Sequence, residues 1–64
     1  MFTKQELTVI AYGLEDHIVV LNGSIHNLEG YTDVMNCHLR RAHEQARDET
    51  RILLNKVQEL ETDA

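Results

Sequence analysis

The sequence predicts an all-α protein of one domain, residues 1–64, in which helices over about 4–29 and 33–61 form an antiparallel hairpin. Two observations predict this fold. The chain contains no proline, so nothing interrupts long helices. Four leucines also recur at every seventh position, and such a row stays nearly in line along an α-helix because two turns take about 7.2 residues. These leucines are Leu7, Leu14, Leu21 and Leu28.

The first helix has a defined start. Thr3-Lys4-Gln5-Glu6 is a capping box, in which the Thr3 hydroxyl accepts a hydrogen bond from the Glu6 amide and the Glu6 carboxylate accepts one from the Thr3 amide. Phe2 before the cap and Leu7 after it form a hydrophobic staple. Apolar residues then recur every three or four positions, as on an amphipathic helix. The core predicted for this helix is Leu7, Ile10, Leu14, Ile18, Leu21, Ile25 and Leu28.

Two glycines lie inside this pattern. Gly13 and Gly23 each cost roughly 1 kcal/mol relative to alanine in a helix interior. Asn22-Gly23 is also a turn signal, which would break the helix near residue 22. We expect the helix to continue, because Ile25 and Leu28 keep the phase of the residues before the glycine.

Gly30 is the predicted end of the first helix, in the left-handed conformation that glycine adopts at a C-terminal cap. Thr32 or Asp33 then caps the second helix. The apolar residues of that helix again follow spacings of three and four. Its predicted core is Met35, Leu39, Ala42, Ala46, Leu53, Val57 and Leu60.

Antiparallel pairing brings these two apolar rows together. Leu7 is expected opposite Leu53, and Leu21 opposite Leu39, with alanine layers between larger ones. The combined apolar stripe is wider than one helix pair can cover. We therefore expect a second copy to cover it, giving a homodimeric four-helix bundle. A different protein bound to the same surface is the alternative.

The chain resembles the Rop family of plasmid copy-number regulators in length, in layout, in the opening Thr3-Lys4-Gln5-Glu6, in a turn near residue 30 and in core layers that mix large residues with alanine. The resemblance implies a helical hairpin that dimerises into a four-helix bundle and binds paired RNA loops. The family's RNA face lies on the first helix and uses basic, amide and aromatic side chains. Lys4 matches that face, whereas the later positions do not, being Ala11, Glu15, Val19 and His26.

Length and charge exclude several classes of protein. The chain has 64 residues, net charge −5 and one cysteine, Cys37. A chain this short is marginally stable alone, and without a second cysteine it has no internal disulfide, so a partner chain is expected. A single thiol is typical of a reducing compartment, and no apolar run approaches the ~20 residues of a membrane span. We expect a cytoplasmic protein with no membrane contact.

No pattern for catalysis or cofactor binding is present. His17 and His43 are expected to face each other near the seam, where they would bind a metal or, as we favour, only set the register. Cys37 and His38 are adjacent and point about 100° apart on a helix, so they do not form a nucleophile and its base. We therefore expect no enzyme activity, no catalytic residue, no cofactor and no metal.

The second helix carries a row of arginines. Its members are Arg40, Arg47 and Arg51, with Arg41 to the side. Such a row can bind phosphates of RNA or of a small anion. Acidic residues at spacings of three and four interrupt the row, which favours an exposed face of ion pairs, including Arg40–Glu44 and Glu44–Arg47.

These observations predict a small regulatory or inhibitory protein that acts by binding another protein, as accessory proteins of phages and mobile elements do. Two alternatives remain. One is an RNA-binding regulator that uses the arginines of the second helix. The other is an oligomeric binder of a small anionic, nucleotide-like ligand. The expected partners are a second copy and a protein target, with nucleic acid less favoured because the chain is acidic.

Overall fold

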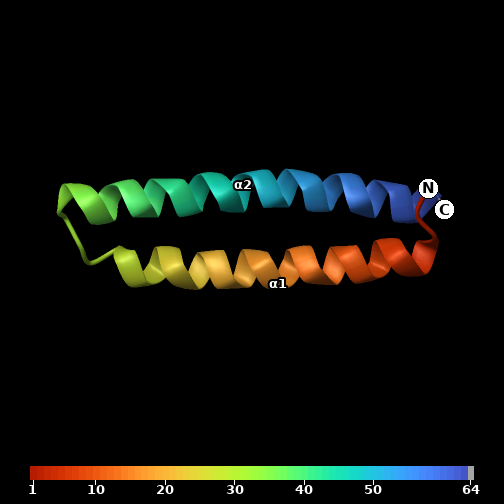
Figure 1. Cartoon of the computed structure of the whole chain (residues 1–64), viewed down its shortest axis with the longest axis horizontal. Helices are drawn as coiled ribbons and strands as arrows, with labels where there is room; N and C mark the ends of the chain where they lie inside the picture. The colour runs from red at the N-terminus through yellow and green to blue at the C-terminus, as the bar shows by residue number, and fades with distance from the viewer. Residues whose placement is uncertain (64) are drawn as a thin grey trace.

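The computed structural model describes residues 1–63 and shows an antiparallel hairpin of two helices, α1 (Lys4–Leu28) and α2 (Val34–Asp63), as Figure 1 shows. The all-α prediction is confirmed, and the predicted helix bounds differ from the observed ones by one or two residues. Ala64, the last residue of the predicted domain, lies outside the described residues. The hairpin measures 46 × 14 × 14 Å, with both termini at one end.

Helix α1 begins at the predicted capping box. The Thr3 amide donates to Glu6 Oε1 at 2.8 Å, and the Glu6 amide donates to Thr3 Oγ1 at 3.1 Å. The hydrogen bond from the Thr3 amide, helped by the Thr3 side chain, holds the pKa of the Glu6 carboxyl below its ordinary value of 4.5, because it favours the charged form. The cap therefore satisfies backbone donors that the first helical turn leaves free.

Helix α1 continues through both glycines, as expected. Gly13 and Gly23 have helical conformations, and a Cβ atom at either position would meet nothing within 4 Å. No neighbouring backbone requires a glycine there in the single chain. The apolar side chains on either side of Gly23 stay on one face, since Leu21 and Ile25 are both buried.

The turn between the helices differs from the prediction at Gly30, because no glycine has a positive φ. Tight hydrogen bonds of the i to i+3 type end α1 instead: the Glu29 amide donates to the His26 carbonyl at 3.3 Å, and the Tyr31 amide donates to the Leu28 carbonyl at 3.1 Å. These bonds satisfy carbonyls at the helix end without a left-handed residue.

Asp33 caps α2. Its Oδ2 accepts from the Asn36 amide at 3.1 Å, its Oδ1 accepts from Asn36 Nδ2 at 2.8 Å, and its carbonyl accepts from the Cys37 amide at 3.0 Å. The hydrogen bonds from Asn36 lower the pKa of the Asp33 carboxyl from its ordinary value of 3.8. Of the two residues proposed from the sequence, Asp33 is therefore the cap.

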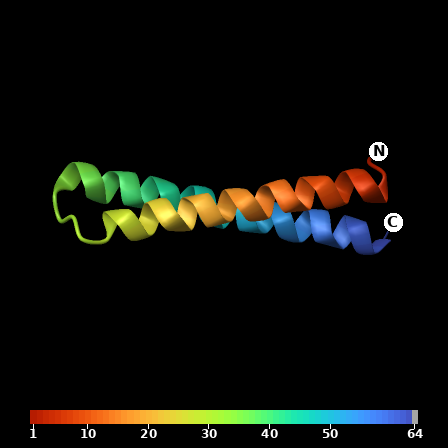
Figure 2. The same ribbon diagram turned by 90° about the horizontal axis from the view of Figure 1, so that it is seen from below.

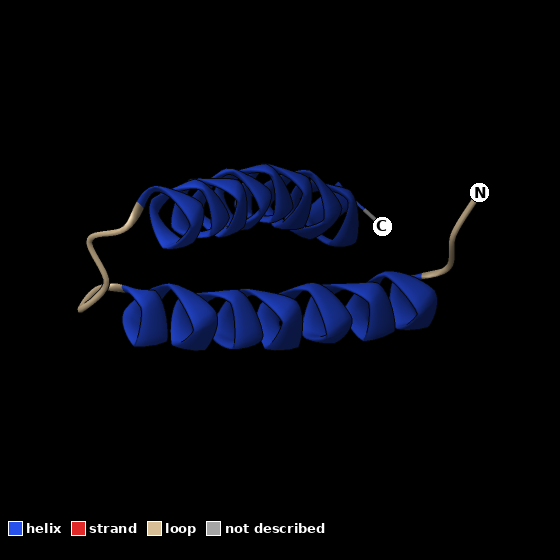
Figure 3. Ribbon diagram, turned by 60° about the vertical axis from the view of Figure 1, so that its left-hand side comes forward, coloured by secondary structure: helices blue, strands red, loops and turns tan. Residues whose placement is uncertain are grey.

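The core lies along the seam between the helices. One cluster combines buried residues of both helices with the half-buried Ile10 and Leu14; the buried members are Leu7, Ala11, Ile18, Leu54 and Val57. Leu21 and Ile25 extend the buried row of α1 toward the turn. The two helices cross at a shallow angle, which Figure 2 shows, and Figure 3 shows the same pair from the side. A supercoil of this kind keeps a heptad row in contact along the length of a helix.

For α2, the row of residues that the sequence predicts to face α1 is not the row that faces it in the structure. Leu54 is 9% exposed and fills the seam, whereas the predicted Leu53 is 49% exposed. The residues of α2 that face α1 follow spacings of four and three, one position further along the chain than six of the seven predicted core residues; the seventh, Val57, is buried as predicted. This row is Asn36, Arg40, His43, Arg47, Thr50, Leu54, Val57 and Glu61. Because one residue corresponds to about 100° of helix rotation, the apolar row turns away from α1.

We expect acid to destabilise the hairpin partly through its two helix caps. Folding lowers the pKa of both Glu6 and Asp33, so their stabilisation is present above the ordinary values of 4.5 and 3.8 and is lost as the pH falls through the lower folded values. Urea unfolding followed by circular dichroism between pH 2 and 7 measures this loss. The double variant Glu6→Gln, Asp33→Asn is expected to depend less steeply on pH than the wild type. Glu59→Gln, at an exposed site outside the caps, is the control, and an equal slope in the double variant contradicts the prediction.

Candidate protein-binding face

The phase of α2 leaves one broad side of the hairpin apolar and uncovered. Residues about 90° to one side of the buried row of α1 are Ile10, Gly13, His17, Val20 and Ser24. Residues about 90° to the corresponding side of the buried row of α2 are Met35, Leu39, Ala42, Ala46, Leu53 and Leu60. Because the two helices run antiparallel, both sets lie on the same broad side, which we call the open face.

Five members of the predicted core of α2 therefore belong to the open face and are exposed in the single chain. They are Met35, Leu39, Ala42, Leu53 and Leu60. Ala46, at the edge between the seam and the open face, is half-buried, as is Ile10 of α1. The reason is geometric. Two helices share a single seam, and only one of the two neighbouring rows of α2 can lie in that seam, so the other row stays exposed.

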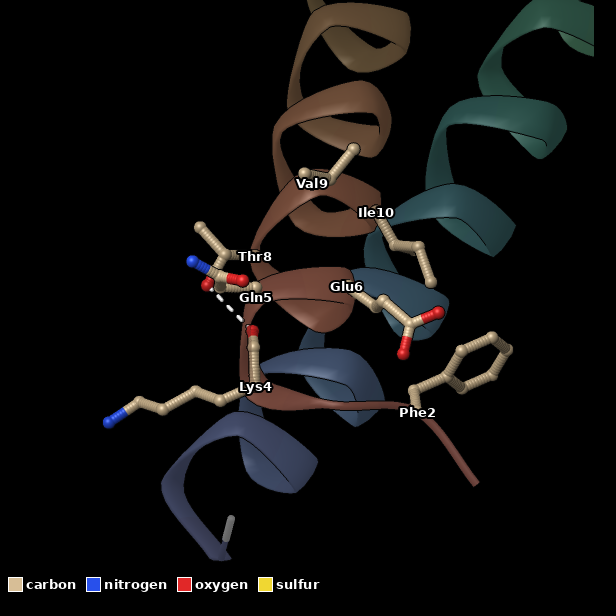
Figure 4. A pocket seen from close by; sticks show the side chains of 7 residues that line it. All are labelled: Phe2, Lys4, Gln5, Glu6, Thr8, Val9 and Ile10. Atoms are coloured by element: carbon tan, nitrogen blue, oxygen red, sulfur yellow. Dashed lines mark hydrogen bonds between the residues drawn. The ribbon is translucent and has the colours of Figure 1, made fainter.

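Two surface depressions lie at the end of the hairpin where α1 begins and α2 ends. One, of about 220 Å³, is lined by residues from both ends of the chain, among them Phe2, Leu7 and Leu60. The other, of about 780 Å³, has Phe2, Glu6 and Ile10 in its wall. Figure 4 shows these three side chains on the same side of α1, whereas Lys4 and Thr8 point to the other side. The exposed ring of Phe2 thus extends the open face beyond the start of α1.

The opposite broad side of the hairpin is polar. On α1 it carries Thr8, Glu15, Asn22 and His26, and on α2 it carries Glu44, Arg51, Asn55, Gln58 and Thr62. A hairpin with one apolar and one polar side is amphipathic as a whole. An exposed apolar surface of several hundred Å² on a small protein marks an interaction site.

A smaller apolar ridge follows the outer edge of α1. Val9, Tyr12 and Val19 are all more than 60% exposed and lie on the side of α1 away from α2. We call these three residues the outer ridge. They are separate from the open face, because Val19 and its neighbour Val20 point about 100° apart.

The arginines do not form the single exposed row that the sequence predicts. Arg40 and Arg47 turn toward α1, with 33% and 25% of their side chains exposed, whereas Arg41 and Arg51 are exposed. Arg47 Nη1 donates to Asn22 Oδ1 of α1 at 3.4 Å. The arginine row is divided because Arg40 and Arg47 belong to the row of α2 that faces α1.

The ion pairs of this region agree with the prediction in part. Arg40 Nε lies 3.5 Å from Glu44 Oε1, which is the expected i to i+4 pair. Arg47 pairs with its neighbour Asp48 at 3.3 Å instead of with Glu44. The Arg40 contact lacks hydrogen-bond geometry, so its buried Nε has no hydrogen-bond partner among the described residues. A buried donor in that state is destabilising.

The residues proposed for chemistry differ in their burial. His17 is exposed on the open face, and His43 is half-buried in the seam. Cys37 is a half-buried free thiol near the start of α2. Within residues 1–63, no group of three or more histidine, cysteine, aspartate or glutamate side chains is placed to hold a metal ion.

The predicted core omitted two residues that the structure buries. Ala11 and Leu54 are buried in the central cluster. The signal for Leu54 was present, because Thr50, Leu54 and Val57 keep the spacing of four and three. The stronger apolar row of Leu39, Ala42, Ala46 and Leu53 concealed it.

Comparisons with protein families, with curated proteins and with solved structures find no match to this chain. Neither helix of residues 1–63 has the length and apolar character needed to cross a membrane.

The buried Nε of Arg40, which has no hydrogen-bond partner among the described residues, generates a prediction. Arg40→Met keeps a long side chain against α1 and removes the buried donor, so we expect the free energy of unfolding to rise by about 1 kcal/mol. Arg41→Met, one residue further and exposed, is the matched control and should change stability by less than about 0.5 kcal/mol. Urea unfolding at a fixed protein concentration measures both variants. A loss of stability in Arg40→Met alone would show that the Arg40–Glu44 pair outweighs the buried donor.

Proposed function

We propose that this chain is a small non-enzymatic regulatory or inhibitory protein of the cytosol, of the kind found in phages and mobile elements, that acts by binding other protein chains. The observation that supports this function is the open face, where large apolar side chains such as Leu39, Leu53 and Val20 are 46–64% exposed. Surfaces of this kind are covered in a working protein, because apolar area in water costs about 25 cal/mol per Å².

The working form that we propose is a homodimer in which two open faces stack into a four-helix bundle. A chain of 64 residues has a small core, and the single hairpin buries few side chains of α2. Stacking two hairpins removes the exposed apolar rows of both helices from water at once. The architecture is that of the Rop-like resemblance, which stays a prediction.

The outer ridge remains available in such a dimer, because it lies at the edge of α1 and not on the open face. We assign the contact with a target protein to this ridge. Its central residue, Tyr12, is 63% exposed and offers a rigid ring of the type that is enriched at binding hot spots. Val9 and Val19 lie within two turns of it on the same side of the helix.

RNA binding through α2 has less support. Two of the four arginines, Arg40 and Arg47, lie partly buried in the seam and are paired with neighbouring side chains. The surface left to phosphate is then that of Arg41 and Arg51, on a chain of net charge −5. Because Arg40 and Arg47 lie in the seam, the arginines of the described residues do not form a compact cluster that could bind a small anion.

Adjacent residues supply matched variants for the dimer. Val20 and Leu53 lie on the open face, whereas their neighbours Val19 and Ile52 are similarly exposed, at 69% and 57%, but point away from it. We expect Val20→Glu or Leu53→Glu to raise the dimer Kd at least about 30-fold, since each buries an unpaired charge worth about 2 kcal/mol or more. Val19→Glu and Ile52→Glu should leave the Kd within about threefold of wild type.

Sedimentation equilibrium measures these dimer constants, and circular dichroism checks that each variant stays helical. Equal weakening by open-face and control variants would contradict the assignment of the dimer interface. A wild-type protein of monomer mass at all concentrations would contradict the dimer itself.

The target contact is tested separately, in the cells from which the chain comes. A photo-crosslinking residue replaces Val19 of the outer ridge, and a matched control replaces Glu59 on the outer edge of α2. We expect a discrete protein adduct from the Val19 position that Tyr12→Ala weakens, because the ring would occupy the centre of the contact. Equal adducts from both positions, or adducts of RNA, would contradict the proposed function.

A further inference from the structure

The open face allows two ways of stacking two copies about a two-fold axis, and we infer that the copies lie with their turns at the same end. This inference rests on the dimer proposed above and names its topology. In the same-end arrangement, α1 of one copy lies over α2 of the other. In the opposite-end arrangement, each helix lies over its own counterpart, reversed.

The levels of residues along the hairpin follow from its packing. Leu7 shares a cluster with Leu54 and Val57, and it lines one depression with Leu60. Glu6, the residue before Leu7, is therefore level with Lys56 within about one helical turn. Both helices rise 1.5 Å per residue in opposite directions, so His17, ten residues after Leu7, lies within about one turn of Glu49.

The same-end arrangement keeps these levels across the dimer interface. Glu6 then lies beside Lys56 of the second copy, and His17 beside Glu49 of the second copy. Lys56 and Glu49 both lie on the outer rim of the open face, where a long side chain reaches the helix stacked on it. Because of the two-fold axis, each contact occurs twice in the dimer. The contact of Glu6 with Lys56 joins opposite charges, and the contact of His17 with Glu49 joins an imidazole to a carboxylate.

The sizes of the side chains fit the same arrangement. Val20 is level with the small residues Ala42 and Ala46, so the large side chain of one copy is placed over small ones of the other. Ser24 is correspondingly level with Leu39. Alternation of large and small residues is what lets packed helix layers interdigitate.

The opposite-end arrangement places like charges together. The centre of α2, which spans Val34–Asp63, lies near Glu49. When two copies of α2 cross in reverse, their Glu49 carboxylates meet at the two-fold axis, and like charges in a contact are unfavourable. Glu6 in turn faces the region around Ser24 and Asn27, where no basic side chain lies on the open face.

The size of the open face is sufficient for a stable dimer. It is 46 Å long and 14 Å wide between Cα atoms; side chains widen the hairpin to about 20 Å, so each copy presents a footprint of about 900 Å². A standard stable interface buries about 800 Å² on each partner. A second copy therefore covers the face along its full length without any other chain.

The single cysteine of the chain reports on the topology directly. Cys37 lies three residues after the start of α2, at the turn end of the hairpin. A nitroxide spin label on Cys37 gives one label per copy, and pulsed EPR measures the distance between the two labels. With turns at the same end the labels are level, about 20–30 Å apart across the bundle. With turns at opposite ends they are separated by about 33 Å along the axis as well, giving about 40 Å.

A second labelling site controls for any change of structure that a label on the half-buried Cys37 causes. The variant Cys37→Ser, Glu59→Cys carries the label at an exposed position near the other end of α2. The same two distance ranges apply to it. Short distances from both sites support the inference, and a distance near 40 Å from either site overturns it. A monomer mass with no dipolar signal overturns the proposed dimer together with its topology.

Charge variants test the same contact without labels. Lys56→Glu places a carboxylate beside Glu6 of the second copy and should raise the dimer Kd about two- to fivefold. Adding Glu6→Gln, which preserves the capping box, should recover most of that change. Lys4→Glu, on the polar side of the hairpin, is the control. Equal effects of Lys56→Glu with and without Glu6→Gln would overturn the assigned pair.

Discussion

The buried row of α1 is the contact on which the rest of this structure depends. Leu7, Ile18, Leu21 and Ile25 lie in one line along the 25 residues of α1, and their burial removes a continuous apolar row from water. Helix α2 is held against this line along its whole length. Caps and turn bonds determine where each helix begins and ends, but they contribute little to the contact between the helices.

The seam changes character along its length. Near the termini, Leu54 and Val57 oppose the apolar row of α1, whereas near the turn the facing residues of α2 include Arg40, His43 and Arg47. Long basic side chains can cover apolar neighbours with their methylene groups while their charged ends reach water or a partner. The turn half is accordingly the part of the hairpin with polar groups inside and apolar groups, such as Met35 and Leu39, outside.

This distribution explains why the hairpin alone is an incomplete apolar core. A row of large and small apolar residues continues along the outside of α2, on the same side as Ile10 and Val20 of α1. A helix that exposes two adjacent apolar rows is typical of bundles, where each helix contacts two neighbours. In the dimer that we propose, Glu6, Glu49 and Lys56 distinguish one stacking of two hairpins from another, in addition to the part that Glu6 takes in the capping box.

The sequence by itself determined the two helices, their bounds to within two residues, the capping box at Thr3 and a cap at either Thr32 or Asp33. These features depend on contacts between residues three or four positions apart, and such spacings can be recognised in the sequence. The local prediction failed at Gly30. Hydrogen bonds of the i to i+3 type end α1 there, and Gly30 does not adopt the left-handed conformation that the sequence predicts. Only the tertiary structure decided which row of α2 faces α1, and hence that Leu54 is buried while Leu53 is exposed. That choice is a rotation of about 100°, and it depends on how all the side chains of both helices fit together along the seam, which no short stretch of sequence specifies.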